Sequence, residues 1–168
     1  METEKWFQRS FAFALPASRF PNLLERLRGT PARLDERMRD LPAERLTRVH
    51  SGRWSAQENV GHLLDLEPLW LRRAKQYFAG ERELVPADLT NRATTDANHN
   101  ARSLDDLLSG FRTARMELVR VLTDADDTIL SRTAVHPRLE RELRLIDLAE
   151  FVAEHDDHHL AVIGALTR

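Results

Sequence analysis

The sequence predicts an all-α protein, a four-helix bundle with a long connection between its second and third helices. Three observations lead to this fold class. Apolar residues recur at the spacing of an amphipathic helix in four separate blocks. No convincing set of alternating segments indicates strands, and the six glycines are scattered, with no repeat or linker that would divide the chain. The 168 residues therefore suit one domain, with residues 1–20 as an N-terminal extension and residues 20–168 as the helical bundle.

The first predicted helix covers residues 20–41, where leucines and a methionine follow the helical spacing. Gly29, Thr30 and Pro31 interrupt this pattern. Threonine is a good N-cap and proline is favoured at the first helical position, so the sequence allows a restart or a kink there. Pro42 marks the end of the helix.

The second predicted helix has the best-defined start. Ser55 and Glu58 form a capping-box pattern, in which the serine hydroxyl accepts from the amide of Glu58 while the carboxylate accepts from the amide of Ser55. Apolar residues keep the helical period from there to Gly80. We expect one long helix between Ser55 and Gly80.

The long polar connection, residues 81–101, contains Pro86 and three asparagines. Connections of this length are usually functional or partly mobile. The third predicted helix begins after Ser103, a residue suited to N-capping, and its apolar positions continue to Leu122.

Residues 124–144 give a mixed pattern. Pro137 excludes a helix interior at residues 135–137, and residues 139–143 are compatible with either a helix or a strand. The last predicted helix covers residues 147–166. Because the second connection is long, the sequence leaves the order of the helices around the bundle open.

Composition narrows the classes of function. Apolar residues make up 42% and charged residues 31% of the chain, which is typical of a soluble globular protein. The formal charge of −2 and the pI of about 6.4 give no basic surface for nucleic acid. The absence of cysteine excludes disulfides, a thiolate nucleophile and cysteine-based metal sites. The N-terminal apolar stretch is too short to span a membrane, so we predict a cytoplasmic protein that binds neither nucleic acid nor a membrane.

Three of the seven histidines cluster in the last predicted helix: His155, His158 and His159. On a helical wheel His155 and His159 lie about 40° apart in the middle of the apolar face, and His158 lies at its flank. Buried imidazoles need partners for their nitrogens. The i, i+4 spacing lets two rings converge on one divalent metal, although a backbone carbonyl could satisfy such a ring instead.

A metal needs a third ligand, and His62 is the best candidate among the other histidines. It lies one turn after the capping box, so its ring can point into the bundle. The alternative is a histidine that simply packs at a helix contact. The remaining histidines precede the second helix or lie in irregular segments, and we predict that they are surface or loop residues: His50, His99 and His136.

Two short motifs, far apart in the chain, carry a resemblance to a known family. The first is Gly-Arg-Trp-Ser at residues 52–55, followed by Glu58, Gly-His-Leu at residues 61–63 and Asp65. The second is Glu-His-Asp-Asp-His-His-Leu at residues 154–160. In this order and separation, the motifs resemble the DinB/YfiT-like superfamily of metal-dependent enzymes. The resemblance covers the chain from about residue 23 to residue 163, including the first-helix region.

This resemblance implies a DinB/YfiT-like four-helix bundle, commonly a homodimer, with a three-histidine site that holds nickel or zinc. Carried over position by position, the ligands are His62, His155 and His159, while His158 is a neighbour that does not bind. Val162 stands where many relatives have glutamine. A polar group that would orient a ligand or substrate is therefore missing at that position.

Three neutral nitrogens leave a divalent ion an open coordination position, which is typical of catalytic sites. Such a position can activate water for hydrolysis or hold a thiolate. The superfamily includes S-transferases and an isomerase that use low-molecular-weight thiols. Because this chain has no cysteine, any thiol would come from a cosubstrate.

Glu58 and Asp65 are the carboxylates nearest to His62 on the helical wheel. Either could orient an imidazole or act as a general base, although the capping box already accounts for Glu58. Several aromatic residues could line a pocket, but their helical spacing is more typical of a core or a dimer face: Trp54, Trp70, Tyr77 and Phe78.

The sequence thus predicts a metal-dependent hydrolase or thiol-dependent S-transferase that acts on a small molecule. The alternative is a non-catalytic, stress-associated module that binds a metal or a ligand. A third reading is a histidine network in the core that binds no metal.

Overall fold

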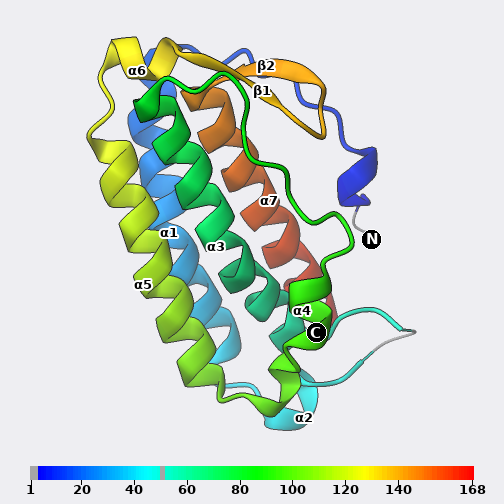
Figure 1. Cartoon of the computed structure of the whole chain (residues 1–168). Coiled ribbons are helices and arrows are strands. Elements are labelled where there is room, and N and C mark those ends of the chain that lie inside the picture. The colour runs from blue at the N-terminus through cyan, green and yellow to red at the C-terminus, as the bar shows by residue number, and fades with distance from the viewer. Residues whose placement is uncertain (1–3, 50–51) are drawn as a thin grey trace.

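Four long helices form the bundle that the sequence predicts (Figure 1). The computed structural model describes residues 4–49 and 52–168. Two apolar clusters, one toward each end, fill the interior of the bundle. The long helices in the described ranges are α1 (Phe20–Met38), α3 (Ala56–Ala79), α5 (Leu104–Thr123) and α7 (Leu145–Leu166).

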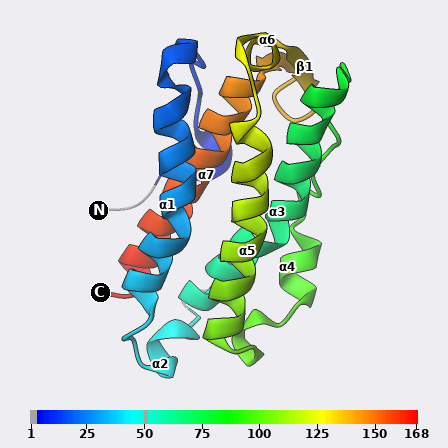
Figure 2. The ribbon, with the colours of Figure 1, turned by 90° about the vertical axis from the view of Figure 1, so that its left-hand side faces the viewer.

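The helices do not follow one another around the bundle. Helices α1 and α3 each pack against both α5 and α7, so α1 and α3 are diagonal although they are consecutive long helices. One apolar cluster joins the end of α1, the starts of α3 and α5 and the end of α7 through Leu34, Val60, Phe111 and Ile163. Helices α3 and α5 therefore run in the same direction, and α1 and α7 run in the opposite one (Figure 2).

The long connection, residues 81–101, makes this order possible. It runs back from the end of α3 to the end of the bundle where α3 began (Figure 1). Two short elements in it, α4 (Arg92–Asp96) and η3 (His99–Ala101), pack against α3. Because the chain returns before α5 starts, α5 lies parallel to α3.

The predicted helix starts are confirmed at both serine caps. Ser55 Oγ accepts from the Glu58 amide at 3.1 Å, and Glu58 Oε2 accepts from the Ser55 amide at 2.7 Å, which completes the capping box. Ser103 caps α5 through the amide of Asp106. Helix α3 ends at Gly80, whose φ of 74° suits glycine.

Helix α1 continues through Pro31, so the restart that the sequence allows does not occur. Proline cannot donate to the carbonyl four residues earlier, which here belongs to Leu27. Arg115 Nη1 of α5 donates to that carbonyl at 3.4 Å. A side chain from another helix thus replaces the missing helical hydrogen bond.

Residues 124–144 form structure that the sequence leaves unassigned. A short helix, α6 (Asp127–Ser131), precedes an antiparallel hairpin of β1 (Thr133–His136) and β2 (Arg141–Arg144), in which Ala134 pairs with Leu143. The expectation of no strands is therefore wrong for these eight residues. Each strand has only four residues, too few for alternation to show in the sequence. A further short helix, α2 (Ala43–Leu46), follows α1.

The N-terminal extension packs along the bundle. It contains the short 3-10 helices η1 (Trp6–Gln8) and η2 (Ala17–Arg19). The rings of Trp6 and Phe11 lie 5.1 and 5.2 Å from the ring of Phe151 on α7. None of the helices in the described ranges is both long and apolar enough to cross a membrane.

One buried ion network connects the four long helices near their midpoints. Arg115 of α5 has no exposed surface and donates from Nη2 to Glu67 Oε1 of α3 at 2.5 Å and to Asp156 Oδ1 of α7 at 3.0 Å. Thr30 of α1 donates to Asp156 Oδ2 at 2.8 Å. Each of the four helices therefore contributes one side chain to the network.

We predict that Arg115→Met lowers the free energy of unfolding by about 3–5 kcal/mol, because it leaves two buried carboxylates without a cation. Urea denaturation followed by circular dichroism measures this change. Replacing the whole network with Glu67→Leu, Arg115→Met and Asp156→Leu restores most of the loss, since well-packed apolar residues can substitute for a buried ion network.

The control is Lys75→Met, which removes the exposed pair between Lys75 and Glu117 and changes the free energy of unfolding by less than about 1 kcal/mol. If Arg115→Met were no more destabilising than this control, the network would not hold the bundle together.

Candidate metal centre

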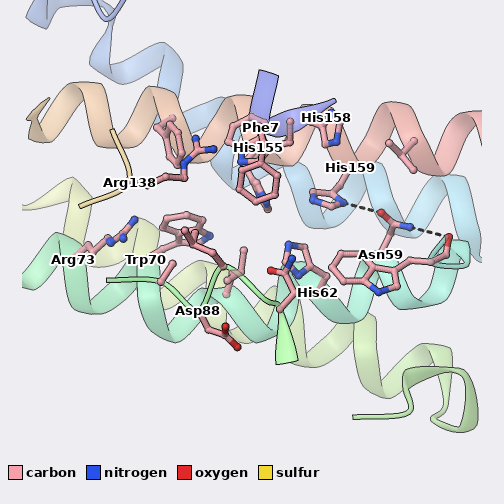
Figure 3. Close-up of a pocket in the computed structure, with 18 of the residues that line it drawn as sticks. Phe7, Asn59, His62, Trp70, Arg73, Asp88, Arg138, His155, His158 and His159 are labelled. Atoms are coloured by element: carbon pink, nitrogen blue, oxygen red, sulfur yellow. Dashed lines mark hydrogen bonds between the residues drawn. The ribbon is translucent and has the colours of Figure 1, made fainter. Parts of the chain in front are cut away.

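Three histidines meet between α3 and α7. His62 of α3 and His155 and His159 of α7 are buried, and each offers a ring nitrogen such that the three nitrogens lie within 4.8 Å of one another. The ring centres of His155 and His159 are 4.5 Å apart, and those of His62 and His159 are 4.8 Å apart. Figure 3 shows the three rings pointing toward one another. The structure thus brings together the three residues that the sequence selects.

Asn59 fixes the orientation and the tautomer of His159. The Asn59 amide nitrogen donates to the backbone carbonyl of Ser55 at 2.7 Å, so its Oδ1 faces His159 Nδ1, which lies 2.7 Å away (Figure 3). Since Oδ1 can only accept, Nδ1 carries the proton. The lone pair of His159 is therefore on Nε2, where it is available to a metal.

A relay from the long connection fixes His62 in the same way. Thr94 of α4 donates from Oγ1 to Asp65 Oδ2 at 2.9 Å, because a carboxylate only accepts. His62 Nδ1 lies 3.1 Å from the same hydroxyl and therefore donates to it. His62 also keeps its lone pair on Nε2. Asp65 thus acts on His62 through Thr94 and does not contact it directly.

His99 lies in the long connection, as expected, but it is buried, so the expectation of a surface position is wrong. It has no exposed surface, and its Nε2 donates to Asp65 Oδ2 at 2.8 Å. Its ring packs directly on α3, where a Cβ atom at Gly61 would lie 2.2 Å from it. Only glycine allows this close approach. The sequence shows Gly61, but not the segment that folds back onto it.

His155 is held mainly by aromatic packing. The ring of Trp6 from the N-terminal extension meets it edge-on at 4.9 Å, and Trp70 of α3 lies 5.8 Å away. Its Nδ1 is buried and has no hydrogen-bond partner in the described part of the chain. A buried ring nitrogen without a protein partner is a feature that an ion in the cluster would explain.

Burial keeps the three imidazoles neutral. It lowers the pKa of His62 to about 4, and it holds the pKa values of His155 and His159 well below the ordinary value, with the neighbouring histidines adding to the shift. Neutral imidazole is the form that binds metal. The donor set of three neutral nitrogens suits a divalent ion such as zinc or nickel, so the residues present fit the metal that the sequence predicts.

A cavity of about 270 Å³ opens over the histidine cluster. Val162 lies in its wall, so the position at which the sequence predicts a missing polar group offers only apolar surface. His158 also lies in the wall, and the cluster of three histidines does not include it. Aromatic rings from several parts of the chain line the rest: Trp6, Phe7, Trp54, Trp70 and Phe151.

The aromatic residues considered from the sequence divide into two groups. Trp54 and Trp70 line the cavity, and the ring of Trp54 lies 4.6 Å from that of His62. Tyr77 instead donates its hydroxyl to the Leu143 carbonyl at 2.9 Å, and Phe78 packs against the apolar cluster at the far end. The expectation of a core role therefore fits Tyr77 and Phe78, and also Trp70, which belongs to the same buried apolar cluster while it lines the cavity.

The end of the cavity away from His62 and His159 carries positive charge. Arg73 of α3 and Arg138 of the hairpin turn both line the cavity, and Trp70 lies between Arg73 and the histidines (Figure 3). His136 lies beside them with 1% of its surface exposed, which corrects the expectation of a surface or loop residue. Burial and the two arginines lower the pKa of His136 to about 3. His50 lies outside the described residues.

The two carboxylates selected from the sequence do not reach into the cavity. Glu58 is engaged in the capping box, which is the alternative that the sequence offers for it. Asp65 accepts from Thr94 and His99. Sequence reasoning missed Asn59, although it lies on the face of α3 adjacent to His62, and missed Thr94, which no local pattern marks.

Comparison with known proteins places this fold among solved structures. YfiT from Bacillus subtilis, described as a probable metal-dependent hydrolase with an unusual four-helix bundle topology, matches with a TM-score of 0.83 and 18% sequence identity. The match covers 95% of this chain and 92% of that chain. A mycothiol-dependent maleylpyruvate isomerase matches with a TM-score of 0.70 and 11% identity, over 93% of this chain and 64% of that chain.

At these identities the two likenesses show the fold alone. A search of curated proteins found no match to the sequence. The family model of the DinB superfamily matches residues 26–163, which include the three clustered histidines and most of the bundle. The chain therefore belongs to the DinB superfamily.

Proposed function

We propose that the protein is a metal-dependent enzyme that acts on a small molecule at His62, His155 and His159. The observation that carries this proposal is the convergence of three buried, neutral imidazoles within 4.8 Å of one another beneath a cavity of about 270 Å³. The Nε2 atoms of His62 and His159 have no hydrogen bond within the described residues, so both lone pairs are available.

The proposed ligands are these three histidines, and the proposed ion is nickel or zinc. A divalent ion with three protein ligands supplies an open position that activates water or a thiol as a nucleophile. Asn59 and Thr94 hold two of the rings in the metal-binding tautomer. The rings of Trp6, Trp54 and Trp70 exclude bulk water around the cluster, which strengthens electrostatic interactions with a bound substrate.

The proposed reaction is either hydrolysis or transfer to a low-molecular-weight thiol. YfiT is described as a probable metal-dependent hydrolase, and the similar isomerase is mycothiol-dependent. The chain contains no cysteine, so the thiol route needs a thiol cosubstrate. Panels of esters and amides, and separate panels of electrophiles with thiols, distinguish the two reactions.

One observation favours a second candidate, a module that binds a metal or a ligand without catalysis. Glu58 and Asp65, the carboxylates selected as bases, are engaged in structural hydrogen bonds away from the cavity. For such a module, added metal would raise the melting temperature while neither panel gave turnover that a chelator abolishes.

We predict that the protein, purified without a histidine tag, binds about one divalent ion per chain. The triple variant His62→Ala, His155→Ala, His159→Ala loses this ion together with any chelator-sensitive turnover. Elemental analysis after gel filtration measures the metal, and circular dichroism checks that the variant is folded. If the wild-type protein and the triple variant contained the same amount of nickel and the same amount of zinc, the metal proposal would be wrong.

We predict that Thr94→Val weakens metal binding by about 10–100-fold, because His62 Nδ1 loses its acceptor and the ring loses its fixed tautomer. Competition with a chelating dye measures the affinity. The matched control is Thr95→Val, which alters an exposed neighbour that bonds only to the carbonyl of Asn91. Equal affinities for the two variants would show that the relay does not act on the site.

We predict that the metal-free protein loses stability as the pH falls from about 6.5 toward 4. The unfolded chain protonates its histidines near pH 6.5, whereas the pKa of folded His62 is lowered to about 4. The unfolded state then binds more protons, and each such histidine removes up to about 1.4 kcal/mol per pH unit from the free energy of unfolding.

Urea denaturation in the presence of a chelator, at pH values between 7.5 and 5, measures this slope. The triple alanine variant has a shallower slope because it lacks three of the buried neutral histidines. An unchanged slope in the variant would contradict the assignment of neutral rings to the cluster.

A further inference from the structure

Two guanidinium groups in the cavity have no carboxylate partner. Arg73 is 1% exposed, and its Nε donates to the Val85 carbonyl at 3.0 Å while its Nη1 donates to His136 Nε2 at 2.9 Å. Arg138 Nη2 is buried and has no hydrogen-bond partner in the described part of the chain. The described residues thus give both cations neutral surroundings only.

The surroundings of Arg138 are aromatic. Its guanidinium carbon lies 5.6 Å from the ring centre of Trp6, 5.2 Å from that of Phe7 and 5.3 Å from that of Phe151. These rings stabilise a cation through their π-faces. They offer no acceptor in the plane of the guanidinium, so its hydrogen-bond donors remain available at the cavity.

Most other arginines at partly or fully buried positions are paired with acids, whereas Arg132 donates to the backbone carbonyls of Tyr77 and Phe78. Arg115 binds Glu67 and Asp156, and at the start of α7 the partly buried Arg144 pairs with buried Asp147. Burying a cation without a counter-ion is costly. Arg73 and Arg138 have no acid partner in the described part of the chain and both face the same cavity, which points to a ligand as their counter-ion.

Electrostatics supports this assignment. Burial, with the charge of Arg138 acting in the same direction, lowers the pKa of Arg73 to about 10. Both groups are still charged at neutral pH, so two like charges repel each other in a confined space. An oxyanion between the two guanidinium groups would offset the repulsion and would accept hydrogen bonds from the donors that have no partner.

The acid in the cavity wall does not meet this need. Asp88 is exposed, and its two oxygens accept from the amide and hydroxyl of Thr90 and from the amide of Arg92. Those bonds hold the carboxylate on the long connection. Figure 3 shows Asp88 apart from Arg73 and Arg138.

We propose that Arg73 and Arg138 form an oxyanion subsite that binds a carboxylate or phosphate group of the small molecule that enters this cavity. That the same molecule reacts at the histidine cluster rests on the proposed function; anion binding itself does not. Trp70 lies against both Arg73 and His155. The guanidinium carbon of Arg73 is 5.5 Å from the ring centre of Trp70, and the ring centres of Trp70 and His155 are 5.8 Å apart. A single aromatic side chain therefore separates the subsite from the cluster, and one small anionic molecule can reach both.

Calorimetry with metal-stripped, full-length protein in a chelator tests the subsite without any metal contribution. The probes are phenylacetate, phenyl phosphate and the neutral amide phenylacetamide, which share an aromatic body. We expect at least one of the two anions to bind about tenfold or more tightly than the amide. The tighter anion identifies the group that the subsite takes. Equal binding of all three probes would overturn the proposal.

Arg138→Gln is the main variant, because Arg138 has no hydrogen bond to lose in the described structure. It should weaken anion binding by about tenfold or more while leaving amide binding unchanged. Arg141→Gln, in the same hairpin but over Phe13 and outside the cavity wall, is the matched control and should bind all probes as the wild type does. Unchanged anion binding by Arg138→Gln would overturn the proposal.

Arg73→Lys provides a second test that keeps the charge and loses the planar donor pair. The melting curve of this variant shows whether it is folded. If it is not folded, the comparison of anion and amide binding by the wild-type protein still tests the proposal. Metal analysis separates this inference from the proposed function. If the triple alanine variant lost the ion but still bound the anion, the subsite would stand by itself; if wild-type protein bound metal but no anion, the subsite alone would fail.

Discussion

The buried salt bridges of Arg115 constrain the whole bundle. Carboxylates stabilise a guanidinium that has no exposed surface, and here α3 and α7 supply those carboxylates while α1 supplies a hydroxyl and a carbonyl oxygen. Asp156 is the direct neighbour of His155 on α7. The network therefore fixes how α7 is rotated against α3, and that rotation decides whether the histidines of the two helices can meet.

The site depends equally on the segment between α3 and α5. That segment returns along the bundle, places Thr94 and His99 against the first turns of α3, and so ties Asp65 to His62 through a hydroxyl group. A parallel arrangement of α3 and α5 needs such a return. The topology of the bundle and the orientation of one proposed metal ligand are thus two results of the same stretch of chain.

Local patterns in the sequence predict the four helices, both serine caps and the pairing of His155 with His159, because each depends on residues within a few turns of one helix. The position of His62, one turn after the capping box, makes it the candidate third ligand, and the resemblance implies the same residue. His99, His136 and the hairpin could not be predicted in this way. Their burial results from contacts between distant segments, such as the fit of His99 on Gly61, and a single isolated histidine in a loop carries no signal of such contacts. Arg73 and Arg138 look like ordinary charged residues until the fold places them in one cavity.

The distribution of indole rings gives the molecule an internal optical reporter. The chain has three tryptophans, and Trp6, Trp54 and Trp70 all line the cavity over the histidines, although they come from the N-terminal extension, the turn before α3 and α3 itself. All of the tryptophan emission therefore originates around this one cavity. An open-shell ion such as nickel would quench that emission, whereas zinc, with its filled d shell, would leave it largely intact. The colour and intensity of the native fluorescence therefore distinguish the occupants of the cavity without any added label.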